Sequence, residues 1–137
     1  MRNVFIIIIL FWVHVAACPN NAHKEDNVFK YMDCNLRNIH QYLIYCGIKN
    51  LDIVYKQAIL ETGYLTSKNC KKRNNLFGFR RCKQYYTYNH WTESIEHYKR
   101  FQKENYKGGD YYVFLKNVGY AEDSLYVSKL KRIKIKT

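Results

Sequence analysis

Apolar residues recur at helical spacing in the part of the chain that follows residue 27. Between Val28 and Tyr45 they occupy positions 28, 32, 36, 39 and 43, a pattern typical of an amphipathic helix, and Gly47 is expected to end it. A second helix is predicted to begin after Asn50, a favourable N-cap, and to run to Thr62, where Gly63 stops it. These two helices predict the first half of a packed helical domain.

Three further helices are predicted in the C-terminal half. The first is capped by Asn89 or His90 and carries an apolar stripe of Trp91, Ile95, Tyr98 and Phe101. The second is capped by Asp110 and runs to Val118, and the last begins at Asp123 or Ser124 with Tyr126, Leu130 and Ile133 facing inward. Helices shorter than ~15 residues are marginally stable alone, so we expect all of these helices to pack on one another.

The segment from 66 to 90 does not follow the helical pattern. It contains no acid and carries seven bases, namely Lys68, Lys71, Lys72, Arg73, Arg80, Arg81 and Lys83. Residues 85–88, Tyr-Tyr-Thr-Tyr, are of a type that favours strands. We therefore expect a loop or short β-hairpin, inserted in a single, mainly α domain that spans residues 27–137.

The first 18 residues have the pattern of an export signal. Met1-Arg2 supplies a positive end, residues 4–17 carry no charged side chain, and small residues precede Cys18. The junction resembles the bacterial lipobox, in which the cysteine is lipidated and becomes the first residue. We expect a signal peptide at 1–17, a tether at 18–26, and a membrane-anchored lipoprotein that faces the periplasm or cell wall. An ordinary signal peptide cut nearby and an uncleaved anchor are the alternatives.

Four more cysteines follow, and export to an oxidising compartment allows two disulfides among Cys34, Cys46, Cys70 and Cys82. Three connectivities are possible. We favour a bond between Cys70 and Cys82, because it would close the basic segment and offset ~3 kcal/mol of unfolded-chain entropy in the simple model. A zinc site is disfavoured because the histidines are scattered and no C-x-x-C pair occurs. We expect no metal and no cofactor.

Composition adds a strong basic character to this picture. The 137 residues include 23 Lys and Arg against 11 Asp and Glu, 47% hydrophobic residues and 14 Tyr. Such a chain can bury a core, which argues against disorder. A basic, Tyr-rich chain can also bind nucleic acid, but an exported protein meets little of it. An acidic partner outside the cell would be attracted to the same surface.

One carboxylate continues an apolar stripe. Leu51, Val54 and Ala58 lie on one face of the second helix, and the next position of that face is Glu61. Burial of an unpaired carboxylate favours its protonated form. Glu61 is therefore a candidate general acid at a cleft, with a helix-end side chain that swings into solvent as the alternative.

Four motifs occur in the order found in the bacterial β-N-acetylglucosaminidases of glycoside hydrolase family 73. Residues 58–63 (Ala-Ile-Leu-Glu-Thr-Gly) and Thr66-Ser67 resemble the family's A-x-x-E-S/T-G and its following S/T pair, and residues 74–78 resemble N-N-L-F-G. Residues 91–95 are similar to W-x-E-S-I, and residues 119–130 to G-Y-A-T-D-P-x-Y-A-x-K-L. The resemblance covers most of the predicted domain.

The resemblance implies a compact helical fold of the lysozyme type, with a cleft for peptidoglycan and cleavage of the β-1,4 bond on the reducing side of N-acetylglucosamine. Glu61 matches the family's acid, and Tyr120 matches a tyrosine of its catalytic centre. Asn75 and Phe77 match the segment that shapes the cleft floor. Four further aromatic side chains can stack on sugars or pack in the interior, namely Tyr85, Tyr86, Tyr88 and Trp91.

The sequence departs from the family in the insert. Many members carry a second Glu there, facing the acid, but this chain has no Asp or Glu between Thr62 and Thr92. A two-carboxylate inverting scheme, with groups ~6.5–9.5 Å apart, cannot draw its base from the insert. The substrate's acetamido oxygen is the first replacement, Glu122 or Asp123 the second, and Glu93 the third.

Two other activities fit the same motifs. A lytic transglycosylase needs one acid and produces an anhydro sugar, and a wall-binding lipoprotein without catalysis needs none. The sequence favours a hydrolase because both Glu61 and Tyr120 are present.

Overall fold

The computed structural model describes residues 27–135. A 3-10 helix at Val28–Tyr31 precedes six α-helices: α1 (Leu36–Tyr45), α2 (Leu51–Thr62), α3 (Lys68–Arg73), α4 (Trp91–Asn105), α5 (Tyr111–Asn117) and α6 (Tyr126–Arg132). Two strands, β1 (Arg80–Arg81) and β2 (Gln84–Tyr85), form an antiparallel hairpin between α3 and α4. The expected fold class, a mainly α, lysozyme-like domain with a short β insert, is confirmed. The predicted signal peptide, Cys18 and the tether lie outside the described residues.

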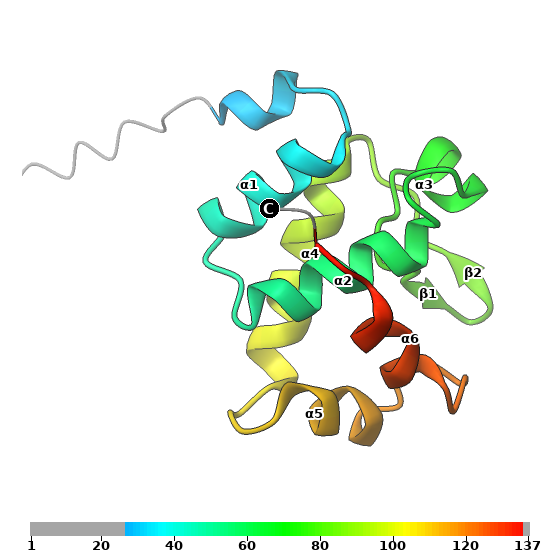
Figure 1. Cartoon of the computed structure of the whole chain (residues 1–137). Coiled ribbons are helices and arrows are strands. Elements are labelled where there is room, and N and C mark those ends of the chain that lie inside the picture. Colours follow the sequence, from blue (N-terminus) through cyan, green and yellow to red (C-terminus); the bar gives the residue numbers. More distant parts are fainter. Residues whose placement is uncertain (1–26, 136–137) are drawn as a thin grey trace, which may run out of the picture.

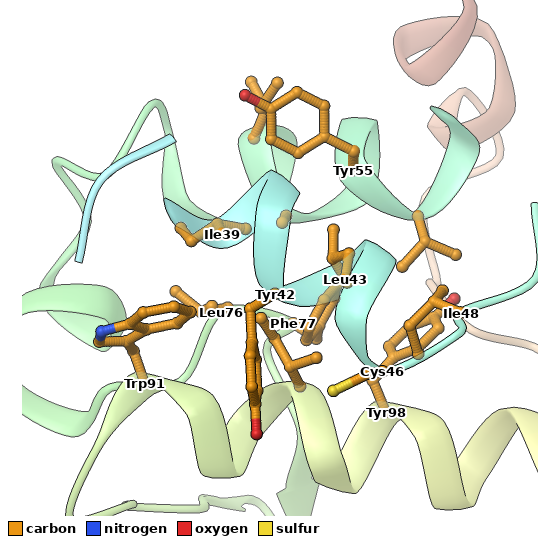
Figure 2. Packing of buried hydrophobic residues seen from close by; sticks show 14 of the residues in the cluster. Ile39, Tyr42, Leu43, Cys46, Ile48, Tyr55, Leu76, Phe77, Trp91 and Tyr98 are labelled. Carbon is orange, nitrogen blue, oxygen red and sulfur yellow. The ribbon is translucent and has the colours of Figure 1, made fainter. Parts of the chain in front are cut away.

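Helix α2 lies at the centre of this arrangement (Figure 1). It packs against α1 and against α6, and α1 also packs against α4. The core between these helices is apolar and aromatic, and Figure 2 shows Tyr42 of α1 together with Trp91 and Tyr98 of α4 within it. Helix α2 is therefore packed on two sides.

The predicted limits of α2 are confirmed, although one of its caps works differently. Gly63 adopts a left-handed conformation with φ +52°, and its N–H donates to the carbonyl oxygen of Leu60, as expected for a glycine that ends a helix. Asn50 precedes the helix but is itself left-handed, and its side chain makes no capping hydrogen bond. The helix therefore starts without the side-chain cap that the sequence suggested.

The first predicted helix is shorter than expected. Residues 28–31 form only a 3-10 turn, and α1 begins at Leu36. Asn35 explains the break, because its extended backbone and its side chain, which accepts a hydrogen bond from the N–H of Asn38, form an N-cap. The apolar spacing runs across this cap without revealing it.

The insert contains a helix that the sequence analysis did not predict. Ser67 caps α3 by accepting a hydrogen bond from the N–H of Cys70, and Asn74 ends it in a left-handed conformation. Cys70 is the one buried residue of α3, so the helix has no apolar stripe to be recognised. The predicted strand at 85–88 is limited to Gln84 and Tyr85.

The remaining helix starts agree closely with prediction. His90 caps α4 by accepting a hydrogen bond from the N–H of Thr92, and the Glu93 carboxylate reaches back to the N–H of Asn89, one residue before the cap. Asp110 caps α5 with bonds from two backbone N–H groups. Helix α6 starts slightly later than expected, at Tyr126 rather than directly after Asp123.

The cysteines of the described range are all free thiols, and their arrangement does not favour the expected pairing. Cys70 is buried and forms a thiol hydrogen bond with Cys34, whereas Cys82 is exposed on the hairpin. The Cys70–Cys82 bond stays a prediction, and the structure favours Cys34 as the neighbour of Cys70. Between residues 27 and 135, no helix has both the length and the apolar character needed to cross a bilayer.

Candidate active site

A cleft of about 510 Å³ opens beside the end of α2. Its walls come from the last turn of α2, the segment after α3, the hairpin, the loop between α5 and α6, and α6 itself. Among the described residues, the lining comprises Leu60, Glu61, Asn69, Phe77, Gly78, Arg80, Tyr85, Gly119, Tyr120, Ala121, Glu122, Asp123, Tyr126 and Lys129. Elements distant in sequence thus meet at Glu61.

Glu61 lies in the wall of this cleft, against the backbone of Gly78. A Cβ atom built on Gly78 would lie 3.0 Å from Oε2 of Glu61, and Gly78 has φ +67°. Both observations favour glycine at position 78, since a side chain there would be strained and would press on the carboxyl. The segment after α3 can therefore approach the carboxyl closely enough to exclude water from one of its sides.

The environment of Glu61 favours its protonated form. Burial raises the pKa of the Glu61 carboxyl, and a hydrogen bond with Tyr126 opposes that rise. The opposing group is thus a neutral tyrosine and not one of the seven bases of the insert. Arg80, a base that lines the cleft, pairs instead with Glu122 at 2.6 Å.

Tyr120 faces the same cleft from the loop before α6. Its hydroxyl donates to the carbonyl oxygen of Phe77 at 2.8 Å, and burial raises the pKa of Tyr120 well above its ordinary value. The hydroxyl is therefore neutral, and its proton is donated to the Phe77 carbonyl oxygen. Its oxygen can still accept a hydrogen bond from a ligand N–H.

The comparison with known families agrees with this geometry. The family model described as mannosyl-glycoprotein endo-β-N-acetylglucosaminidase, or glucosaminidase, matches residues 37–136. This chain belongs to the glucosaminidase family. No curated protein and no solved structure matches the chain. The matched range contains the whole cleft, which places the domain among the peptidoglycan glycosidases.

Two residues expected to bind sugar lie in the interior of the glucosaminidase domain. Trp91 is only 2% exposed, and its Nε1 donates to the carbonyl oxygen of Met32. Asn75 is fully buried, and its amide bonds the backbone of Phe79 and Tyr86, which holds the base of the hairpin. Both expectations are corrected, since these side chains stabilise the walls and are not available to a glycan.

The other aromatic candidates are divided between the cleft and its support. Phe77 is buried but contributes to the cleft floor, and Tyr85 lines the cleft and is 42% exposed. Tyr86 and Tyr88 stack on each other beside His97, and the Tyr88 hydroxyl bonds Nδ1 of that histidine. These last two tyrosines pack against α4 and are not among the cleft residues, so only Tyr85 of the four aromatics can reach a sugar there.

The three alternative carboxylates have different surroundings in the glucosaminidase domain. Glu122 lines the cleft, is largely exposed and pairs with Arg80 across it. Asp123 also lines the cleft, but its ion pair with Lys129 lowers the pKa of Asp123 below its ordinary value, and it also accepts a bond from the N–H of Leu125. Glu93 caps α4 and is absent from the lining. Glu122 is thus the carboxylate most available to a substrate.

Sequence reasoning missed the partners of Glu61. Gln57 lies one helical turn before Glu61, is fully buried and donates to the Tyr126 hydroxyl at 3.2 Å. The sequence predicted Tyr126 to face inward but not to contact the acid. A polar residue four positions before a buried carboxylate is a signal that could have identified this face as a polar network.

Proposed function

We propose that this glucosaminidase domain hydrolyses the β-1,4 bond on the reducing side of N-acetylglucosamine in peptidoglycan, with Glu61 as general acid. The single observation that carries the proposal is the Glu61 carboxyl, enclosed by Gly78 in the wall of an open cleft, with its pKa raised by burial. A carboxyl that keeps its proton towards neutral pH can protonate a leaving oxygen.

Tyr120 is the second participant. Its proton is held by the Phe77 carbonyl oxygen, so its own oxygen is an acceptor. An acetamido N–H of the substrate is a matching donor. That bond would orient the acetamido oxygen towards the anomeric carbon, which is the requirement of substrate-assisted hydrolysis, a known exception to the paired-carboxylate scheme.

The reaction then proceeds in two steps. Glu61 transfers its proton to the glycosidic oxygen while the acetamido oxygen bonds to the anomeric carbon, and the carbon–oxygen bond to the leaving sugar breaks. This gives an oxazolinium ion, a sugar hydroxyl and a Glu61 carboxylate. Water then attacks the anomeric carbon and gives a proton to Glu61, which restores the acetamide and the acid. The β configuration is retained.

Product analysis tests the proposal. Digestion of purified sacculi followed by mass spectrometry distinguishes three activities: hydrolysis adds one water per cut, transglycosylation leaves an anhydro sugar, and a binding protein releases no fragments. NMR of fresh product gives the anomeric configuration. We expect hydrolysis with a β product, and an α product would exclude the substrate-assisted route.

We also propose that the protein is exported and anchored through a lipid on Cys18. The uncharged run at residues 4–17 and the small residues before Cys18 support this. Metabolic labelling with an alkyne fatty acid should label the parent protein but not a Cys18→Ser variant. Labelling of both would contradict the anchor.

A further inference from the structure

A row of buried polar side chains crosses the core between the α1–α2 turn and the cleft. It comprises Gln102 and Tyr98 of α4, Tyr111 of α5, Gln57 of α2 and Tyr126 of α6, none of them more than 7% exposed. Across residues 27–135, no buried side-chain nitrogen or oxygen lacks a hydrogen-bond partner. The row is therefore fully bonded, and the direction of each bond can be worked out.

The direction is fixed at the end remote from the cleft. The backbone N–H of Lys49 can only donate, and it donates to Oε1 of Gln102 at 2.8 Å. The Gln102 amide nitrogen must then use its two protons elsewhere. One goes to the carbonyl oxygen of Lys49 at 2.8 Å and the other to the hydroxyl oxygen of Tyr111 at 2.9 Å.

Each following bond inherits this direction. Tyr111 accepts from Gln102, so its own proton points to the Tyr98 hydroxyl, 2.8 Å away. Tyr98 in turn donates to Oε1 of Gln57 at 2.5 Å. With its oxygen used, the Gln57 amide presents Nε2 to Tyr126 and donates to that hydroxyl at 3.2 Å. The oxygen and nitrogen of a side-chain amide are assigned in this way, from the donors and acceptors around them.

The last member of the row is Tyr126, which lines the cleft together with Glu61 and lowers the pKa of that carboxyl as a hydrogen-bond donor does. Because the Tyr126 oxygen accepts from Gln57, its proton is directed to the carboxyl of Glu61. A protonated carboxyl that accepts such a bond on one oxygen carries its own proton on the other oxygen. That other oxygen can then donate its proton to a substrate.

We propose that Tyr126, held in one direction by Gln57 and Tyr98, is a positioning residue that keeps the proton of Glu61 on the oxygen that serves the cleft. This inference rests on the proposed function of Glu61 as the acid. It extends the site to residues that do not touch the cleft, since neither Gln57 nor Tyr98 lines it.

The proposal differs from a purely structural role in one respect. A network that only satisfies buried groups would stabilise the fold without affecting Glu61. A directed network also stabilises the Glu61 anion, so its loss should raise the pKa of Glu61. The other titratable or charged groups that line the cleft around Glu61 are Arg80, Tyr85, Tyr120, Glu122, Asp123 and Lys129, and the test leaves all of them unchanged.

Three variants form the test. Tyr126→Phe removes the donor to Glu61. Tyr98→Phe leaves the cleft intact but frees Gln57 to turn its oxygen towards Tyr126, which would then donate to Gln57 instead of Glu61. Tyr55→Phe is the matched control. Like Tyr98 and Tyr126, Tyr55 is a buried tyrosine, but it lies on α2 outside the row, and its hydroxyl donates to the carbonyl oxygen of Leu36.

The decisive measurement is a carbon-13 NMR titration of the Glu61 carboxyl in protein labelled at glutamate, assigned with Glu61→Gln. Tyr126→Phe should raise the pKa of Glu61, Tyr98→Phe should raise it less, and Tyr55→Phe should leave it unchanged. An unchanged titration in both Tyr126→Phe and Tyr98→Phe would overturn the proposal. Circular dichroism shows whether each variant folds. If only one of Tyr126→Phe and Tyr98→Phe folds, its Glu61 titration decides whether the proposal holds.

Kinetics on sacculi supply a second readout. We expect Tyr126→Phe to lower kcat by on the order of tenfold to a hundredfold, with KM little changed, as for loss of correct orientation at a reacting group. The alkaline limb of the pH profile should move upward. If the domain proves not to hydrolyse glycan, the NMR titration still tests the directed network, so the two failures can be told apart.

Discussion

The backbone of Gly78 lies against the carboxyl of Glu61, so closely that a Cβ at position 78 would be 3.0 Å from Oε2. This contact is made between the segment after α3 and the last turn of α2. It explains why the site needs a glycine at that position and how the carboxyl becomes shielded.

Gly78→Ala should therefore impair activity more than stability. The added methyl group must displace the Glu61 carboxyl by a few tenths of an ångström. Because a displacement of ~1 Å at a reacting group can lower the rate about a hundredfold, we expect a smaller loss, on the order of several-fold to tenfold. The left-handed backbone adds about 1–2 kcal/mol of destabilisation. Activity on sacculi and urea unfolding measure the two effects.

Gly47→Ala is the matched control. Gly47 has nearly the same φ, +66°, but a Cβ there would meet nothing within 4 Å. We expect a similar loss of stability with activity preserved. Equal activity losses in the two variants would show that backbone strain, rather than contact with the acid, is responsible.

Glu61→Gln should abolish hydrolysis and stabilise the fold above acidic pH. Because burial raises the folded pKa of Glu61 above its ordinary 4.5, the parent loses stability as pH rises from about that value through the folded pKa. Glutamine carries no charge and escapes this loss. The difference in unfolding free energy should vanish at low pH and grow towards neutrality, and a difference independent of pH would contradict the raised pKa.

Glu122→Gln tests the second carboxylate. The Arg80–Glu122 pair is exposed, with side chains 50% and 89% accessible, so its loss should change stability by less than about 1 kcal/mol. If the acetamido oxygen is the nucleophile, hydrolysis should persist within a few-fold. A loss of a hundredfold or more, together with an inverted product, would identify Glu122 as a general base.

The contact between Cys34 and Cys70 predicts the disulfide of an exported form. Incubation with oxidised glutathione should join these two thiols, with two protons and two electrons passing to glutathione. Peptide mapping should find this bond in Cys82→Ser protein but not in Cys34→Ser. The closed loop would stabilise the domain by about 4 kcal/mol in the chain-entropy model. Recovery of a Cys70–Cys82 bond from the parent would contradict it.

Helix ends were predictable where one residue determines them. Gly63 and Asp110 act through their own backbone or side chain, and both were identified from local sequence. The break before α1 was not predictable, because the apolar spacing continues across the Asn35 cap. Helix α3 was not predictable either, because the helix that Ser67 caps has no apolar stripe. Helical periodicity detects buried faces, not caps.

The site shows the same division. The location of Glu61 in a cleft follows from its place on the apolar face of α2. The roles of Asn75 and Trp91 could not be predicted, since a motif does not distinguish a side chain that contacts a ligand from one that supports the wall. The bond from Tyr126 to Glu61 joins residues 65 positions apart and depends on how α6 packs on α2.

The packing of α6 on α2 has a further consequence for the folding of the molecule. Helix α6 provides Tyr126 and one side of the cleft, while α1, α2 and α4 form most of the core without it. A form in which α6 has detached would keep much of its compactness and yet have neither an oriented acid nor a complete groove. Activity in a denaturant series should therefore report whether α6 is docked on α2.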